Sequence, residues 1–179
     1  PSLEAGLESV ELEQVSLNDD AHVDLEDAQQ PDMSIESVQE CRVGPWRLAL
    51  SLESMRVQVN ARAPDRNRSH DGTIGDCKHM KRNSDHNPQI WDGDKGVVTA
   101  MDITHDPVHG CDANALANSF AVGRDPRIKY VIWNHRTMSA TNSPWTWRPY
   151  RGANPHTAHI HVSVSSSKRA YDDNSPWAI

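Results

Sequence analysis

An abrupt change of composition near residue 40 limits the part of this chain that can build a folded core. Residues 1–40 contain twelve Asp or Glu, no Lys or Arg, and few aromatic residues. Such a segment has too little apolar surface to offset the entropy that it would lose on ordering. We therefore expect residues 1–40 to form an acidic tail or linker, disordered or weakly helical, and residues 41–179 to form one domain.

The two parts of the chain also differ in charge. The whole chain has 18 Lys or Arg and 25 Asp or Glu, so the domain alone keeps thirteen acids against eighteen bases, a net charge of +5. A positive body with an acidic arm is attracted to polyanions such as nucleic acid, a membrane surface or the bacterial wall. Charge by itself does not choose among these partners.

Neither a membrane segment nor a cysteine framework is visible. No run approaches the roughly 18 apolar residues that a membrane span needs, and no basic then apolar export signal opens the chain. We expect no membrane insertion. Cys41, Cys77 and Cys111 have no metal-type spacing, so we interpret them as unpaired thiols, with one disulfide as the alternative.

Apolar periodicity and turn residues predict a mixture of helices and strands in the domain. The apolar positions Leu48, Leu52, Met55 and Val59 predict a helix that Pro64 ends, and Asp112 is a good N-cap for a second helix closed by Gly123. The remaining segments are an irregular loop over residues 65–96 and strands over residues 97–103, 128–133 and 158–164.

The last strand alternates strictly between two kinds of side chain. Its apolar residues lie on one face, so His159, His161 and Ser163 share the other. One imidazole could bind a metal while the other faces a water bound to that metal. An isolated pair of this kind is more often a surface feature of an edge strand.

Asp102 and His86 strengthen the metal interpretation. Asp102 ends an apolar strand, where a lone carboxylate carries a large desolvation cost unless it meets a cation. His86 lies in the polar loop before that strand, stiffened by Pro88. Two imidazoles and one carboxylate suit Zn²⁺ and leave a fourth position for water. The alternatives are a helix cap or ion pair for Asp102 and a loop hydrogen bond for His86.

Three short motifs then resemble a known family. Ser84-x-His86, Ala100-x-Asp102-Ile103 and His159-x-His161 are similar to the ligand signature of the zinc peptidases that include D-alanyl-D-alanine carboxypeptidases, lysostaphin-type endopeptidases and hedgehog-like domains. Residues 71–76, 84–88 and 156–163 resemble the peptidase domain of endolysins from phages of actinobacteria. The resemblance implies an α+β fold with a small, mainly antiparallel sheet, flanking helices, one Zn²⁺ on the sheet, and cleavage of peptidoglycan stem peptides.

This chain departs from that family at two points. His86 and Asp102 are sixteen residues apart, more than is usual in the superfamily, and we expect residues 89–96 to be an inserted loop. Ala158 occupies the position where carboxypeptidases of the group commonly have a carboxylate base. The second departure points to His159 as the partner of the attacking water.

The resemblance implies a role for each candidate residue. His86, Asp102 and His161 would bind one Zn²⁺ per chain, and His159 would orient or deprotonate the water and later protonate the leaving amine. The other candidates are His79 as an oxyanion donor or a support for a ligand, Arg82 as a partner of a stem-peptide carboxylate, and His156 as an alternate ligand. Purely structural roles for His79 and Arg82 stay equally open. Trp145, Trp147 and Tyr150 could line a groove, although an aromatic mini-core is favoured.

Two other functions stay open as alternatives. One is a zinc-containing wall-binding module without hydrolysis. The other is a metal-dependent nuclease that uses Asp85, His86, Asn134 and His135, which the long separation of the two pairs disfavours. We expect a monomer that binds a peptidoglycan stem peptide and no nucleic acid. It would act at the bacterial cell wall after phage-type release or from a chain with a trimmed N-terminus. A carboxypeptidase, an L-Ala-D-Glu endopeptidase and a cross-bridge endopeptidase are all compatible with this site.

Overall fold

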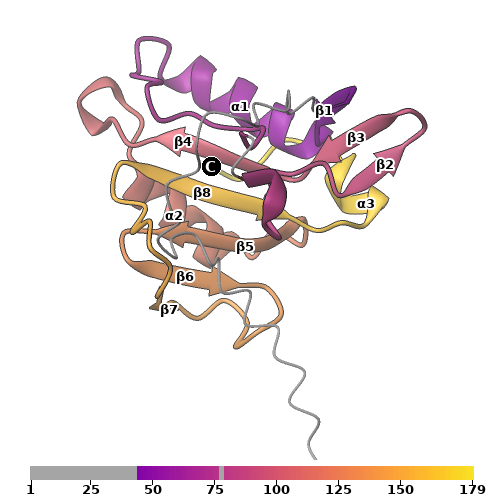
Figure 1. Ribbon diagram of the computed structural model, residues 1–179. Helices are drawn as coiled ribbons and strands as arrows, with labels where there is room; N and C mark the ends of the chain where they lie inside the picture. Colours follow the sequence, from indigo (N-terminus) through magenta and orange to yellow (C-terminus); the bar gives the residue numbers. More distant parts are fainter. Residues whose placement is uncertain (1–43, 77–78) are drawn as a thin grey trace, which may run out of the picture.

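The computed structural model describes residues 44–76 and 79–179, which form an α+β fold with two sheets (Figure 1). The predicted α+β class with mainly antiparallel strands and flanking helices is thereby confirmed, with two sheets in place of the single one expected. The predicted tail, Cys41 and Cys77 lie outside the described residues. Cys111 is a buried free thiol that donates to the carbonyl of Thr104.

A five-stranded antiparallel sheet forms the centre of the molecule. Its strand order is β4-β8-β5-β6-β7. The strands are β4 (Ala100–Thr104), β8 (His159–Val164), β5 (Ile128–Trp133), β6 (Arg136–Ser139) and β7 (Arg148–Pro149). The predicted strands at residues 128–133 and 158–164 are confirmed, whereas β6 and β7 were not predicted, because strands of four and two residues are too short to show an apolar alternation. In the register of β4 with β8, Asp102 lies directly opposite His161.

A smaller sheet stands beside the first. It contains β1 (Trp46–Leu48), β3 (Lys95–Val98) and β2 (Ile90–Asp92) in the order β1-β3-β2, with β1 parallel and β2 antiparallel to β3. Residues 89–96 are therefore largely a β-hairpin and not the loop that the sequence predicted. Because the turn around Gly93, with φ +64°, is polar, the two short strands on either side of it could not be recognised from the sequence. These strands pair with each other, and β3 also pairs with β1.

The strand predicted over residues 97–103 is divided between the two sheets. The division falls at Thr99, whose N–H donates to the carbonyl of Asp85 while its own carbonyl accepts from Val164. Residues 97–98 belong to β3, and β4 starts at Ala100. Apolar residues run through the break because both sheets bury them, so periodicity could not reveal it.

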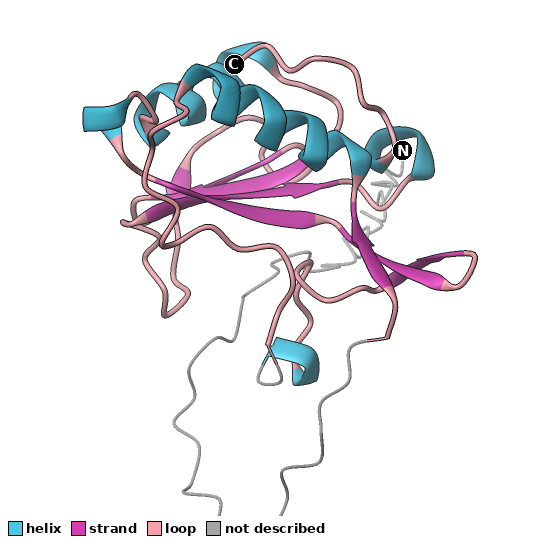
Figure 2. Cartoon of the chain, turned by 90° about the horizontal axis from the view of Figure 1, so that it is seen from above, coloured by secondary structure: helices cyan, strands magenta, loops and turns pink. Residues whose placement is uncertain are grey.

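Helices cover one side of the five-stranded sheet, and the loop that carries the short 3₁₀ helix η1 (His79–Lys81) lies on the other (Figure 2). The helices are α1 (Leu50–Arg62), α2 (Ala113–Gly123) and α3 (Lys168–Tyr171), and a second 3₁₀ turn, η2, spans Pro107–His109. Leu52, Met55 and Val59 of α1 are buried as predicted, but Leu48 belongs to β1.

The start of α2 agrees with the sequence, and its end differs. The Asp112 carboxylate accepts from the N–H of Asn114, as expected of an N-cap. Gly123 is the last helical residue, and the left-handed C-cap is Arg124, with φ +49°.

The two faces of β8 have different surroundings. Ile160, Val162 and Val164 are fully buried in the core. His161 and Ser163, on the opposite face, are also buried, and residues 72–76, Ser84 and His86 of the covering loop line the same pocket as His161. The predicted alternation is confirmed, and the second face is enclosed rather than open.

Candidate metal centre

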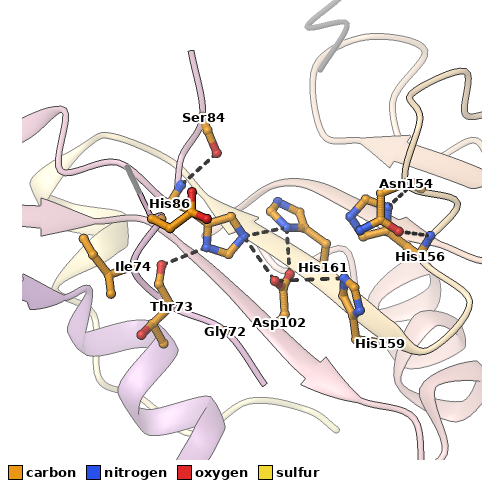
Figure 3. Close-up of a pocket in the computed structure, with 12 residues that line it drawn as sticks. Gly72, Thr73, Ile74, Ser84, His86, Asp102, Asn154, His156, His159 and His161 are labelled. Carbon is orange, nitrogen blue, oxygen red and sulfur yellow. Dashed lines mark hydrogen bonds and ion pairs between the residues drawn. The ribbon is translucent and has the colours of Figure 1, made fainter. Parts of the chain in front are cut away.

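Three side chains from distant parts of the sequence meet on the covered face of the sheet (Figure 3). His86 Nε2 lies 3.2 Å from His161 Nδ1 and 3.4 Å from Asp102 Oδ2, and His161 Nδ1 lies 3.0 Å from Asp102 Oδ1. This group could hold a metal ion. The residues that it contains are the three ligands predicted from the sequence.

The ring of His86 is oriented by a backbone carbonyl. Its Nδ1 lies 2.7 Å from the carbonyl oxygen of Thr73, and because a carbonyl only accepts, the proton is on Nδ1. Nε2 of the neutral ring therefore directs a lone pair toward Asp102 and His161. A hydrogen bond of this kind to the outer nitrogen is what fixes a metal-binding histidine.

The ring of His161 has a hydrogen-bonding group at each nitrogen. Nε2 lies 3.0 Å from Ser163 Oγ, and Nδ1 faces Asp102. With its proton on Nε2, His161 donates to the Ser163 hydroxyl and offers a lone pair at Nδ1 to the cluster. Ser163 is completely buried, so its hydroxyl can accept this hydrogen bond without competition from water.

The cluster is compact enough to share one metal ion. One possible ligand atom from each of the three residues lies within 4.8 Å of the others, and the two carboxylate oxygens of Asp102 face different rings, Oδ1 that of His161 and Oδ2 that of His86. Burial alone would raise the pKa of Asp102, but positive charge on His86 and His161 and hydrogen bonds from their rings hold that pKa well below its usual range. The carboxylate is therefore charged, and a bound cation would take the place of the protons that the two rings direct at it.

The segment from Ser84 to Pro88 is fastened at each residue that surrounds His86. The Ser84 hydroxyl accepts from the N–H of His86, and both carboxylate oxygens of buried Asp85 accept from Lys129 Nζ at 2.9 Å. Asn87 Nδ2 donates to the carbonyl of Arg82 at 2.7 Å. The polar residues of this loop thus hold His86 in position.

Gly72 brings a second piece of backbone against the cluster. It pairs with Asp102 in both directions, with Asp102 N–H donating to Gly72 at 2.8 Å and Gly72 N–H donating to Asp102 at 3.3 Å. A Cβ at residue 72 would lie only 2.9 Å from Asp102 Oδ2. The carboxylate of the preceding residue, Asp71, accepts hydrogen bonds from Arg66 and from the backbone N–H and hydroxyl of Thr104. These bonds keep the backbone at Gly72 close to Asp102.

His159 lies beside the cluster without belonging to it. Its Nε2 is 4.0 Å from Asp102 Oδ2, and its buried Nδ1 has no hydrogen-bond partner among the described residues. Burial lowers the pKa of His159, although the charge of Asp102 opposes this. His159 is consequently a neutral imidazole at neutral pH, next to the donors of the cluster.

His156 is a second buried histidine at the site. Its Nδ1 donates to the carbonyl of Asn154 at 2.7 Å, which leaves Nε2 as an acceptor, and its backbone has the left-handed φ of +53°. Its ring meets that of His159 edge-on, with centroids 4.9 Å apart. Burial, followed by His161 and His159, lowers the pKa of His156 to about 3. His156 stays outside the three-residue ligand group.

These residues surround a pocket of about 310 Å³. Its wall contains Asp102 and the four histidines together with Gly72, Thr73, Ile74, Gly75, Asp76, Ser84 and Asn154. The walls come from the covering loop on one side and from the segment that leads into β8 on the other. The pocket is large enough to admit a short piece of a peptide beside the cluster.

The other predicted site residues have different positions. Arg82 is half-buried and does not line the pocket, and the backbone of His79 begins η1 while its side chain lies outside what the structure describes. Their proposed roles stay predictions. Trp145 and Trp147 pack against the core, in agreement with the favoured mini-core interpretation. Tyr150 meets His156 edge-on.

The residues of the nuclease alternative are not assembled into a site. Asn134 and His135, with φ of +46° and +61°, form the exposed two-residue turn between β5 and β6. Neither lines the pocket. Asp85, the remaining member, is paired with Lys129.

Three contributions to the centre were missed at the level of sequence. Thr73 acts through its backbone carbonyl, which no residue type reveals. Lys129 lies in a strand forty-four residues after its partner Asp85. Ser163 shared the predicted face of the histidines, and its i+2 position after His161 was a signal that could have indicated its role.

Comparison of the chain with models of protein families, with curated proteins and with solved structures gave no match. Among the described residues, no helix is both long and apolar enough to cross a membrane. Any assignment of function therefore depends on the geometry and chemistry of the metal centre and on the resemblance of its motifs.

Proposed function

We propose that this chain is a zinc-dependent peptidase that hydrolyses a peptide bond in the stem peptides of bacterial peptidoglycan. The observation that carries the proposal is the convergence of His86 Nε2, Asp102 and His161 Nδ1 at one wall of a pocket. The motif resemblance supplies the substrate class.

Two nitrogen donors and one carboxylate are a ligand set that Zn²⁺ accepts readily, with a coordination position left for the reaction. When bound, zinc would supply Lewis-acid chemistry, because it polarises the scissile carbonyl and lowers the pKa of a bound water to roughly 7. The protein holds the ligands in place through the Thr73 carbonyl and the Ser163 hydroxyl.

His159 is the residue proposed to move protons. Burial keeps its imidazole neutral, and Nε2 faces the cluster at 4.0 Å from Asp102 Oδ2. In this role Nε2 accepts the proton of the attacking water and returns it to the leaving amine. His159 takes the place of the carboxylate that Ala158 does not provide.

Single substitutions test the proposal. His86→Ala, Asp102→Ala and His161→Ala are expected to lose both bound zinc and the release of muropeptides from purified cell walls. His159→Ala is expected to keep zinc and to lose about 10²–10⁴-fold in rate. Zinc is measured by elemental mass spectrometry, and mass spectrometry of the muropeptides identifies the bond that is cut.

His109→Ala is the matched control, because this exposed histidine pairs with Asp106 on η2 and does not line the pocket. Retention of both zinc and full activity in all three ligand variants would overturn the proposal. Zinc binding by the wild-type protein without release of any muropeptide would favour the non-hydrolytic wall-binding module.

A further inference from the structure

Two of the histidines in the pocket wall form a second pair beside the candidate metal centre. The rings of His156 and His159 meet edge-on, with centroids 4.9 Å apart and an angle of 68° between their planes. The pair of His86 and His161 has almost the same arrangement, with 5.0 Å and 69°. The pocket therefore contains two imidazole pairs of similar geometry, and the candidate metal centre uses only one of them as ligands.

Each ring of the second pair has a nitrogen available for coordination. Nδ1 of His156 donates to the carbonyl of Asn154, so Nε2 carries a lone pair, and no described residue donates a hydrogen bond to it. Nε2 of His159 lies 4.0 Å from Asp102 Oδ2, too far for a hydrogen bond. Burial lowers the pKa of both rings, so both are neutral at neutral pH, the form in which histidine binds metals.

The spacing of the two rings allows them to bind one ion. Zinc lies about 2.0–2.1 Å from a ligating nitrogen and so roughly 3 Å from the ring centre, which allows one ion between rings whose centroids are 4.9 Å apart. Imidazole is a ligand that suits zinc. Figure 3 shows His156 and His159 together on the side of the site away from His86. An ion held by this pair would lie beside the candidate metal centre.

Asp102 lies between the two pairs. Its Oδ2 is 3.4 Å from His86 Nε2 and 4.0 Å from His159 Nε2, so one carboxylate oxygen faces a ring of each pair. The negative charge of this carboxylate attracts a cation on either side. Hydrolases with two metal ions hold them about 3.5–4 Å apart, so a pocket of about 310 Å³ has room for both.

We propose that His156 and His159 bind a second zinc ion, more weakly than the candidate metal centre binds the first. Two side chains serve this ion in place of three, so water completes its coordination and the site fills second. The consequence for catalysis rests on the proposed function. An ion on Nε2 of His159 occupies the lone pair that accepts the proton of the attacking water, so excess zinc inhibits the enzyme that the first zinc activates.

Calorimetric titration with Zn²⁺ of the full chain, stripped of metal by a chelator, tests the site directly. The wild type is expected to bind two zinc ions per chain in two steps. His156→Ala is expected to lose the weaker step and to keep the tighter one. His109→Ala is the matched control and should keep both steps, because this exposed histidine does not line the pocket.

A second variant covers the case in which alanine prevents folding. Residue 156 has a left-handed φ of +53°, a conformation that asparagine adopts more readily than alanine. His156→Asn removes the imidazole and keeps this backbone, so it should also lose only the weaker step.

Cleavage of purified cell walls gives an independent readout. Muropeptide release by the wild type should rise up to one equivalent of zinc. It should then fall roughly 10²-fold or more as the second site fills, because the proton acceptor is blocked. In His156→Asn, the rate should rise over the same range of zinc and should not fall in excess zinc, whatever its maximum.

The possible outcomes separate this inference from the proposed function. A single zinc-binding step in the wild type would overturn the inference, as would a weaker step that persists in His156→Asn. If one equivalent of zinc activates cleavage in either of these cases, the proposed function stands without the second site. Two binding steps, with the weaker one lost in His156→Asn and no cleavage at any zinc concentration, would support the second site and refute the proposed function.

Discussion

The protons on two imidazoles decide which ring nitrogens face the candidate metal centre. The Thr73 carbonyl retains the Nδ1 proton of His86 and so directs Nε2 inward. His161 presents the opposite nitrogen, Nδ1, because its Nε2 reaches Ser163. The orientation of each ring therefore depends on one hydrogen-bond acceptor outside the cluster. The acceptor for His86 is a backbone carbonyl, whereas the acceptor for His161 is a side-chain hydroxyl that a substitution can remove.

Ser163→Ala is expected to weaken zinc binding about 10- to 100-fold, because the Nε2–H of His161 loses its acceptor and the favoured proton moves to Nδ1. The measurement is a competition titration with a chromophoric chelator. Ser165→Ala serves as the control, since this hydroxyl accepts from the N–H of Ser167 and does not line the pocket. Equal zinc affinity in both variants and the wild type would show that Ser163 does not set the proton position.

At the scale of elements, the site depends on how closely the covering loop approaches β4. Gly72 pairs with Asp102 through backbone hydrogen bonds, as if a further strand residue were added to this edge of the sheet. Arg66, Asp71 and Thr104 hold the loop in this position. The fit leaves no room for a side chain at residue 72.

Gly72→Ala is expected to displace the Asp102 carboxylate, since the new Cβ would lie 2.9 Å from Oδ2, and to weaken zinc binding by at least about tenfold. The same chelator titration measures this change. Gly123→Ala is the matched control because a Cβ at this helical position meets no atom within 4 Å. A Gly72→Ala variant with wild-type zinc affinity would contradict the close approach.

On the scale of the whole molecule, the C-terminal segment closes the helical side of the core. Trp177 is 4% exposed, and its indole N–H donates to the carbonyl of Ser51 at 2.7 Å. The guanidinium of Arg127 lies 3.8 Å from the centre of the Trp177 ring. This segment thus connects α1 with the residue that precedes β5.

Trp177→Ala is expected to lower the free energy of unfolding by about 3–5 kcal/mol, because it leaves a cavity between the helices and the C-terminal segment. Urea denaturation monitored by circular dichroism measures the change. Trp91→Ala is the control, since Trp91 is 60% exposed and its loss should alter stability by less than about 0.5 kcal/mol. Equal midpoints for the two variants would contradict the docking of the C-terminal segment.

Several features could be predicted from the sequence because they depend on neighbours along the chain. Alternation placed His159, His161 and Ser163 on one face of a strand, and a polar residue before an apolar helix identified the Asp112 cap. Other predictions were wrong where two short elements adjoin. The break at Thr99 and the hairpin of residues 89–96 depend on which sheet each strand joins, and apolar periodicity does not contain that information.

The amino-acid order determined by itself which side chains share a face, because side-chain direction in a strand follows from backbone geometry over a few residues. Only the tertiary structure decided that Asp102 stands opposite His161 and that the hairpin of β2 and β3 lies between His86 and Asp102 in the chain. The Thr73 carbonyl and Lys129 also reached the site only through folding. These contacts join segments far apart in the chain, so they depend on strand register and loop closure, which no local pattern specifies.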